Sequence, residues 1–334
     1  MARTIVGLEI TEESIRAVEL TRGKRPSVVA AGEVRLPSGI AKDSEVLDLD
    51  AVALAVTQLW SQAGIKSKEV VVGVANRRIL VREHTSPALR PDLMRAALPF
   101  EVQDLLPVPP EQAVLDFYPI AASEGQVHGL LVAAVSETVE TLITALSRAR
   151  LKTAAVDFVP FGLARVAGII APEGATVAVI AVGEHTTNLV VAQNGIPRFA
   201  RIIPVDLGTN APEADRGEPS SAAPTEELPQ ARRALGPAVS EPVSPAATDL
   251  VGRLRNTLNF HASRPGAEPV ATVYLTGPGV QAPGLLQLAG SSLGVPVFTL
   301  DSTNIVAAGR AAPPPGNLAL SLVTTLGVVL GEDQ

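Results

Sequence analysis

The chain has 334 residues, of which 46% are hydrophobic and 3% aromatic, and it contains no cysteine. Its formal net charge of −7 argues against a nucleic-acid partner, because phosphate backbones require clustered Lys and Arg. The lack of cysteine excludes disulfides and thiolate metal sites, and the four histidines lie far apart without ligand spacing, so we expect no metal site. The length allows two domains or lobes with cores built mostly of Val, Leu, Ile and Ala.

No targeting or membrane segment is visible in the sequence. Three glutamates within the first 13 residues interrupt any apolar core of a secretory signal. The most apolar segment, LALSLVTTLGVVLG at 318–331, is too short for a membrane span and contains Ser321, Thr324 and Thr325, so we predict a buried helix there. The chain ends in GEDQ without a basic amphipathic helix, so we expect a cytoplasmic protein with no direct membrane anchor.

The N-terminal stretch GLEITEESIRAVEL predicts two strands around an acidic turn. The strands are Thr4–Ile10 and 15–20, and a strand–turn–strand unit of this kind opens many nucleotide-binding folds. A second interpretation stays open, in which Thr11 caps a helix that carries Glu12 and Glu13 in its first turn.

The next elements indicate an α/β layer. PSVVAAGEVRL at 26–36 predicts a third strand, and DLDAVALAVTQLWSQAG at 48–64 has helical spacing that stops at Gly64. The Val-rich segment KEVVVGV at 68–74 predicts a strand that is buried on both faces.

Residues 77–157 differ from the preceding segment in their sequence pattern, which predicts elements in the order strand, helix, strand, strand, helix. This order fits a small inserted α+β subdomain, and Pro99 should kink or break its first helix. A further strand and helix follow at 154–170. The segments that carry the five elements are 79–88, 90–106, 107–122 and 127–151.

The early pattern returns at Thr176. TVAVIAVGEHTTNLVVAQNGIPRFARII at 176–203 reads as strand, polar turn, strand, Asn-Gly turn and strand, and Asn-Gly between apolar runs is a strong hairpin signal. An internal duplication explains the repeat, and it predicts a cleft between two similar lobes.

Residues 209–247 interrupt this second half. They are rich in Pro, Ala, Glu and Ser, so we expect a disordered loop with one short helix at 226–235. Order should resume with a helix at 249–261. The remaining expected elements are a strand, a Gly/Pro turn and a helix over 270–294, a strand at 296–302, a loop at 311–317 and the C-terminal helix.

Seven segments together resemble the PilM family, the cytoplasmic actin-like proteins of type IV pilus assembly that are related to the division protein FtsA. They occur in the family's order and cover nearly the whole chain outside 209–247. They are GLEITEESIRAVEL, AGIKSKEVVVGV, LPFEVQDLLPVPPEQAVLDFYPI, AAVDFVPFGL, VGEHTTNLVVAQNG, LRNTLNFHASRPG and VYLTGPGVQAPGL.

The resemblance implies an α/β, actin-like ATPase fold of two lobes with an inserted SHS2-type subdomain. The expected division is the first part of lobe one (1–76), the inserted subdomain (77–157), the end of lobe one and start of lobe two (158–208), the Pro/Ala-rich loop (209–247), and the rest of lobe two with the C-terminal helix (248–334). The resemblance also implies a partner, the short N-terminal cytoplasmic tail of a PilN-like inner-membrane protein, which docks on the subdomain side.

The resemblance implies three nucleotide-binding turns, and all three depart from the family's pattern. In the first turn Thr11 replaces a glycine, and Glu12 and Glu13 replace two small residues, which brings carboxylates to a site for phosphate. In the second turn Ala181 replaces the acid that orients Mg²⁺ or water. The third turn reads TGPG, with Pro278 removing one donor.

We therefore predict a degenerate nucleotide cleft and a pseudo-ATPase scaffold, with no catalytic residue and weak or absent ATP binding. ATP and Mg²⁺ remain possible ligands from the resemblance alone. The residues implied for the cleft are Glu9, Thr11, Ser14, Gly183, Thr186, Thr187, Gly277 and Gly279.

Structural interpretations compete with these roles. Gly277 and Gly279 fit a tight turn, Thr186 and Thr187 fit a strand, and Glu12 and Glu13 fit a solvated turn. In the predicted subdomain, Phe100, Leu105 and Leu106 either line a partner groove or pack their helix on its own sheet; we favour packing.

Two other functions stay open. One is an ATP-binding or ATP-hydrolysing member in which Glu9 stands in for the missing acid. The other is a sugar or acetate kinase of the same superfamily, for which Ala181 leaves no general base at the second turn. The sequence does not separate a type IV pilus from a related type II secretion system.

Overall fold

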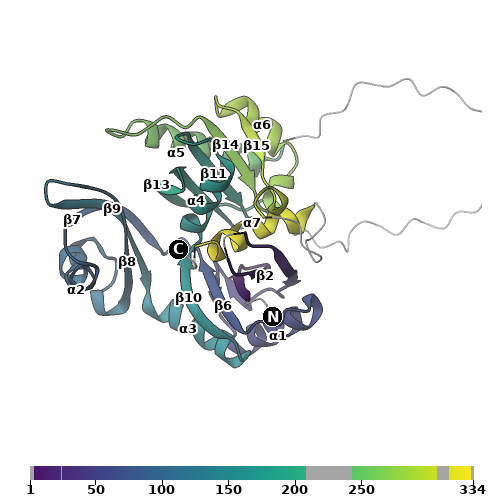
Figure 1. The fold of residues 1–334 in the computed structure, drawn as a ribbon. Coiled ribbons are helices and arrows are strands. Elements are labelled where there is room, and N and C mark those ends of the chain that lie inside the picture. The colour runs from purple at the N-terminus through teal and green to yellow at the C-terminus, as the bar shows by residue number, and fades with distance from the viewer. Residues whose placement is uncertain (1–3, 24, 208–242, 307–315, 332–334) are drawn as a thin grey trace, which may run out of the picture.

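The computed structural model describes residues 4–23, 25–207, 243–306 and 316–331. These residues form two five-stranded sheets with helices packed on them and a smaller, three-stranded sheet to one side (Figure 1). None of the described helices is both long and apolar enough to cross a membrane.

The first sheet has the order β10-β6-β1-β2-β3. β1 pairs with β2 in an antiparallel hairpin and with β6 in parallel, and β6 pairs in parallel with β10. The bounds are β1 (Thr4–Ile10), β2 (Ser14–Thr21), β3 (Val28–Arg35), β6 (Glu69–Val74) and β10 (Lys152–Phe158). A short hairpin of β4 (Ala41–Lys42) and β5 (Glu45–Val46) follows β3 in the chain.

The second sheet repeats this arrangement in the order β13-β12-β11-β14-β15. β11 pairs antiparallel with β12 and parallel with β14, just as β1 pairs with β2 and β6. The repeat of strand order and direction agrees with the predicted duplication. The bounds are β11 (Thr176–Val182), β12 (Thr186–Gln193), β13 (Ile196–Pro204), β14 (Thr272–Thr276) and β15 (Val297–Thr299).

Two helices cover one face of each sheet. α1 (Leu49–Ala63) and α3 (Ser136–Arg148) share a core with the first sheet, and α5 (Pro245–Ala262) and α6 (Leu285–Ser292) share a core with the second. The local sequence fixes α1 at both ends. The Asp48 carboxylate accepts hydrogen bonds from two backbone N–H groups in the first turn, and Gly64 adopts the left-handed conformation that ends the helix, as predicted.

The last helix of each half packs on the sheet of the other half. α4 (Val159–Ile170) follows the first sheet but contacts β11, β12 and β13, whereas α7 (Asn317–Val329) follows the second sheet but contacts β1, β2 and β6. The two helices cross where Gly162 meets Gly327, so closely that a Cβ on Gly327 would lie 2.6 Å from the Gly162 carbonyl. Both helices belong to one core that joins the halves, and α7 is the buried helix expected at 318–331.

The third sheet, of order β7-β9-β8, comes from the segment between β6 and α3. One face packs against the core around α4, and α2 covers part of the other. The bounds are β7 (Leu80–Pro87), α2 (Pro91–Val102), β8 (Ala113–Ser123) and β9 (Gln126–Val135).

Several sequence predictions need correction. Residues 11–13 form a turn between β1 and β2, so the helix capped by Thr11 is wrong. The strand at 152–158, grouped with the inserted segment, pairs with β6 in the first sheet, and α3 packs on α1. α2 runs past Pro99 to Val102, so the predicted break is absent, and the alternative of a kink there stays a prediction.

The predicted loop 209–247 overlaps a helix at its end. α5 begins at Pro245 because the Ser244 hydroxyl caps it, accepting a hydrogen bond from the Ala247 N–H at 3.1 Å. The short helix predicted at 226–235 lies outside the described residues.

Candidate functional site

Three turns meet between the two large sheets. They are residues 11–13 between β1 and β2, residues 183–185 between β11 and β12, and residues 277–279 after β14. Together with the β4–β5 hairpin and α7 they surround a cavity of about 40 Å³. The duplicated halves therefore bring the predicted turns to one place.

The structure brings five of the eight predicted residues to this cavity and leaves three out. Ser14 is buried in β2, Thr187 in β12 and Gly279 within the third turn, and none of them lines the cavity. The five that do are Glu9, Thr11, Gly183, Thr186 and Gly277.

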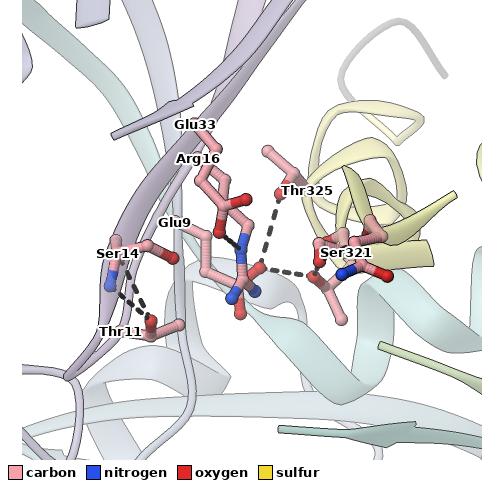
Figure 2. Close-up of polar contacts among 9 residues, drawn as sticks. Glu9, Thr11, Ser14, Arg16, Glu33, Ser321 and Thr325 are labelled. Carbon is pink, nitrogen blue, oxygen red and sulfur yellow. Dashed lines mark hydrogen bonds and ion pairs between the residues drawn. The ribbon is translucent and has the colours of Figure 1, made fainter. Parts of the chain in front are cut away.

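Glu9 is buried beneath α7 (Figure 2). The Thr324 hydroxyl donates a short hydrogen bond to Glu9 Oε2, and the Thr325 hydroxyl donates to the same oxygen at 3.4 Å. Burial raises the pKa of Glu9, and the nearby Glu13 adds to the rise, although Arg16 and the threonine hydroxyls oppose it. Glu9 thus joins the first sheet to α7 through the two threonine hydroxyls.

Arg16 lies beside Glu9 but is bound to Glu33. Its Nε donates to Glu33 Oε1 at 2.8 Å, and only 8% of the Arg16 side chain is exposed. Burial would raise the pKa of Glu33, but the charge and hydrogen bond of Arg16 outweigh it and lower the pKa. The one arginine on the described cavity wall therefore already has a carboxylate partner.

The first turn closes on itself. The Thr11 N–H donates to the Ser14 carbonyl at 2.9 Å. The Ser14 N–H donates to the Thr11 hydroxyl at 3.2 Å (Figure 2). A phosphate turn requires backbone N–H groups that point at the anion. These two N–H groups are instead satisfied within the protein.

The second turn contacts the first directly. His185 Nε2 lies 3.5 Å from Glu13 Oε1, and this contact joins the two halves across the cleft. Within the second turn, the Gly183 N–H donates to the Thr186 carbonyl at 3.0 Å. Burial raises the pKa of Glu184, and the charge of Glu13 raises it further.

The third turn is tied to both β11 and α7. Gly277 has φ of +89°, and a Cβ there would lie 2.4 Å from the Val182 carbonyl oxygen, so only glycine fits. The Thr276 hydroxyl and the Gly277 N–H both donate to the Leu320 carbonyl, at 2.9 and 3.2 Å. These contacts give the glycine at 277 a structural reason that is independent of any ligand.

Acidic groups outnumber basic ones around the cavity. The basic groups on its described wall are Arg16 and His185, and both face carboxylates within the protein. Asp43 pairs with Arg77 at 2.6 Å, outside the cavity wall. The acidic residues that line the cavity are Glu9, Glu12, Glu13, Asp43 and Glu184.

Several contributors to this site were missed from the sequence, among them Asp43, Ser44 and Thr324. Asp43 and Ser44 come from the β4–β5 hairpin, and their positive φ angles of 50° and 62° mark its tight turn. Thr324 lies 315 residues from its partner Glu9. Thr324 is one of three hydroxyl residues in a mostly apolar helix, and these hydroxyls were the signal that could have suggested a buried polar contact.

A second and larger cavity, of about 580 Å³, lies between the third sheet and the C-terminal half. Three of the four histidines line it: His84, His128 and His261. Across the described part of the chain, no group of three or more His, Asp or Glu side chains is arranged to hold a metal.

The hydrophobic residues singled out near α2 divide into two kinds. Leu105 and Leu106 pack against the small core of the third sheet, as we favoured. Phe100 instead is 77% exposed.

Comparisons with known proteins agree with this architecture. The model of a family described as "Type IV pilus assembly protein PilM" matches residues 7–316. A solved structure described as a PilM-PilN type IV pilus biogenesis complex has a chain that is 22% identical, with a TM-score of 0.81, over 99% of this chain and 98% of that one.

Two further structures are similar at lower scores. The ethanolamine utilization protein EutJ of Carboxydothermus hydrogenoformans is 14% identical with a TM-score of 0.54, over 99% of this chain and 90% of that one. A Bacteroides thetaiotaomicron protein described as having an actin-like ATPase fold and unknown function is 9% identical with a TM-score of 0.52, over 98% and 96% of the two chains. The predicted actin-like ATPase fold is confirmed.

Proposed function

Because this chain belongs to the family of type IV pilus assembly proteins described as PilM, we propose that it is a non-enzymatic interaction scaffold of pilus assembly. Its place is the cytoplasmic face of the inner membrane, where a PilN-like membrane protein holds it through a cytoplasmic tail. The similar chain solved in a PilM-PilN complex supports this partner. A related type II secretion system would use the same arrangement.

The state of the cleft is the observation that carries the non-enzymatic part of the proposal. A cavity of about 40 Å³ has room for roughly three waters, at about 10–15 Å³ each, and not for a nucleoside triphosphate. Its wall carries five acidic residues against Arg16 and His185. Two like charges about 4 Å apart at an effective dielectric of about 20 repel by roughly 4 kcal/mol, which exceeds a typical charge-assisted hydrogen bond of about 1.5–3 kcal/mol.

The acid that Ala181 replaces in the second turn has one named substitute, Glu9, whose contacts do not suit that role. Ala181 lines the cavity without a carboxylate. Glu9 is buried and its Oε2 already accepts hydrogen bonds from Thr324 and Thr325, so this oxygen is engaged within the protein rather than directed at Mg²⁺ or an attacking water. These contacts support the proposal that the cleft does not hold Mg-ATP, and we derive no hydrolytic step.

A thermal-shift measurement tests the cleft. Millimolar Mg-ATP should leave the melting temperature unchanged, whereas a ligand at about 100 times its Kd would add about 2.7 kcal/mol of stability. ADP without Mg²⁺ serves as the control for charge. A clear rise with Mg-ATP would favour the alternative of an ATP-binding member.

A titration tests the scaffold itself. We expect the isolated cytoplasmic tail of the PilN-like protein encoded beside this chain to bind the purified full chain, with a scrambled peptide of equal composition as the control. Equal, negligible binding of both peptides at high micromolar concentration would contradict the proposed partner.

A further inference from the structure

Three connecting segments lie together at one end of the first sheet. They lead into β3, β6 and β10, and these three strands run in the same direction as β1, so all of them begin at the same end of the sheet. The acidic turn at 11–13 follows the other end of β1, so the three segments lie opposite the cleft. Their described residues are 22–23 and 25–27, 65–69, and 148–152.

These residues are strongly basic. They include seven Lys or Arg and one acid, Glu69, which gives a net charge of +6 in a chain whose formal net charge is −7. The rest of the chain therefore carries −13. We call the three segments the basic end. So uneven a distribution of charge gives the molecule a positive field on one side, to which an anionic partner is drawn.

Backbone contacts fix the positions of the segments. The Lys152 N–H donates to the Lys68 carbonyl at 2.8 Å, which joins the segments before β6 and β10. Glu19 of β2 is buried, and its carboxylate accepts hydrogen bonds from the N–H groups of Lys66 and Ser67, at 3.1 and 3.2 Å. α1 and α3, which end in these segments, pack against each other (Figure 1). The basic end is therefore a built surface of the first half.

Contacts within the protein account for little of its charge. Arg22 lies 3.6 Å from Glu69, and Arg148 pairs with Asp50. The helix dipoles explain no more, because α1 has no basic residue in its last turn and α3 has only Arg148. Among the described residues, five exposed basic side chains of the basic end have no carboxylate partner: Arg25, Lys66, Lys68, Arg150 and Lys152.

The chemistry of these side chains favours a membrane surface as the partner. The described segments contain no aromatic residue on which a nucleic-acid base could stack. Three of the five unpaired residues are lysines, which are compact charges on flexible stems and suit a broad negative surface better than one fixed phosphate. Clusters of about four to eight Lys and Arg are typical of contacts with anionic lipid.

We propose that the basic end contacts the anionic lipid headgroups of the membrane through charge, with no inserted segment. This inference rests on the proposed function, which places the chain at the cytoplasmic face of the inner membrane, where the surface potential is negative. The contact also orients the molecule. The membrane repels the acidic remainder of the chain, so the cleft at the other end of the first sheet faces away from the lipid.

Vesicle binding tests the contact. The purified full chain should co-sediment with vesicles of phosphatidylglycerol and phosphatidylcholine in equal parts, and not with vesicles of phosphatidylcholine alone. High salt should release it, because salt screens exposed charges. Each basic residue near an anionic surface is worth about fivefold in affinity, so the double variant Lys66→Gln with Lys68→Gln should bind about 25-fold more weakly.

Two further double variants complete the comparison. Arg25→Gln with Lys152→Gln makes the same change on the other two segments and should give a similar loss. Lys42→Gln with Arg255→Gln removes the same charge at exposed positions outside the basic end, and should bind vesicles as wild type does.

The outcomes separate this inference from the proposed function. Equal binding to both kinds of vesicle, binding to neither, or equal losses in all three double variants would overturn the inference. Self-association without vesicles that is lost only in the two basic-end variants would assign this surface to a second copy, and would also overturn it. Both of these variants should still bind the PilN-like tail peptide. A wild-type chain that binds anionic vesicles but no tail peptide would contradict the proposed function and leave the lipid contact standing.

Discussion

In each half of the molecule, three neighbouring strands place one residue each side by side across the sheet, and the two rows of three lie at corresponding positions. In the first half the row is Glu9, Arg16 and Glu33 across β1, β2 and β3. In the second half it is Ala181, Asn188 and Ile202 across β11, β12 and β13. The backbone pairing repeats, while the side chains change from charged to uncharged.

The helices that face these rows differ in the same way. α7, which lies on the first sheet, donates the Thr324 and Thr325 hydroxyls to Glu9. α4, which lies on the second sheet, buries mainly apolar side chains, among them Phe161 and Leu163. The comparison teaches that strand order can be duplicated without duplicating chemistry, because pairing uses the backbone, whereas each row adapts to the helix opposite it.

Each of the helices α4 and α7 has a glycine at their crossing, so a substitution there should have the largest effect on the free energy of unfolding. Gly327→Val would place side-chain atoms against the Gly162 backbone and force the helices apart. We expect a loss of about 3 kcal/mol or more in the free energy of unfolding, measured by urea denaturation. Gly252→Ala in α5, where a Cβ meets no atom within 4 Å, is the control and should be neutral or stabilising.

The next largest effect is expected when Glu9 is replaced by alanine, the residue at the corresponding position, 181, in the second half. Glu9→Ala should lower the free energy of unfolding by about 1–3 kcal/mol, because the hydroxyls of Thr324 and Thr325 lose their buried acceptor. Glu9→Gln keeps an acceptor oxygen and serves as the control. Equal stability of Glu9→Ala and wild type would show that the contact with α7 contributes nothing.

The pH dependence of the free energy of unfolding gives a second test of Glu9. Since burial raises the pKa of Glu9, the folded state holds this proton more tightly than the unfolded state does. The contribution of Glu9 to wild-type stability should therefore fall as pH rises above about 4.3, the usual value for Glu, until the folded-state pKa is passed. Glu9→Gln lacks this loss, so its stability relative to wild type should increase over the same range of pH in denaturation curves.

Glu33 should behave in the opposite sense. Arg16 lowers its pKa, so Glu33 stabilises the fold above its unfolded pKa, and this contribution is lost as pH falls through the folded value. Glu33→Gln should lower the free energy of unfolding by about 1 kcal/mol at neutral pH, a modest figure because 30% of the Glu33 side chain is exposed. The gap from wild type should close in acid; a gap that persists at low pH would point to packing.

The smallest effect is expected where the two turns touch. His185→Ala should change the free energy of unfolding by about 0.2–1 kcal/mol, less at high salt, because the His185 side chain is 35% exposed. A double-mutant cycle with Glu13→Gln measures the pair, and a coupling near zero would remove this contact as a link between the halves.

Local patterns predicted much of the fold. The Asn194-Gly195 hairpin is present, with both residues at positive φ as its turn type requires. The two strands around the acidic turn and the helix ending at Gly64 are confirmed as well. These features depend on neighbours within a few residues, which is the range that spacing and turn chemistry report.

The sequence did not predict strand pairing or side-chain contacts between residues that lie far apart in the chain. The strand at 152–158 follows α3 directly, so its order along the chain placed it with the inserted segment, but its backbone partner is β6, some 80 residues earlier. The candidate site was affected in the same way. Thr11 and Gly183 could be placed at the cleft through their turns, whereas the contacts of Glu9 with Thr324 and of Glu13 with His185 form only when the halves meet.

The exchange of α4 and α7 between the sheets has a consequence for how such a molecule could be divided. A piece that ended after α4 would carry a helix whose apolar side is shaped for the other piece's sheet, and would lack the helix that covers its own. Two identical pieces could satisfy both needs only by trading their final helices, as domain-swapped dimers do. The single chain therefore has the architecture of such a swapped pair after fusion, and co-expressed halves should recover the fold only when both are present.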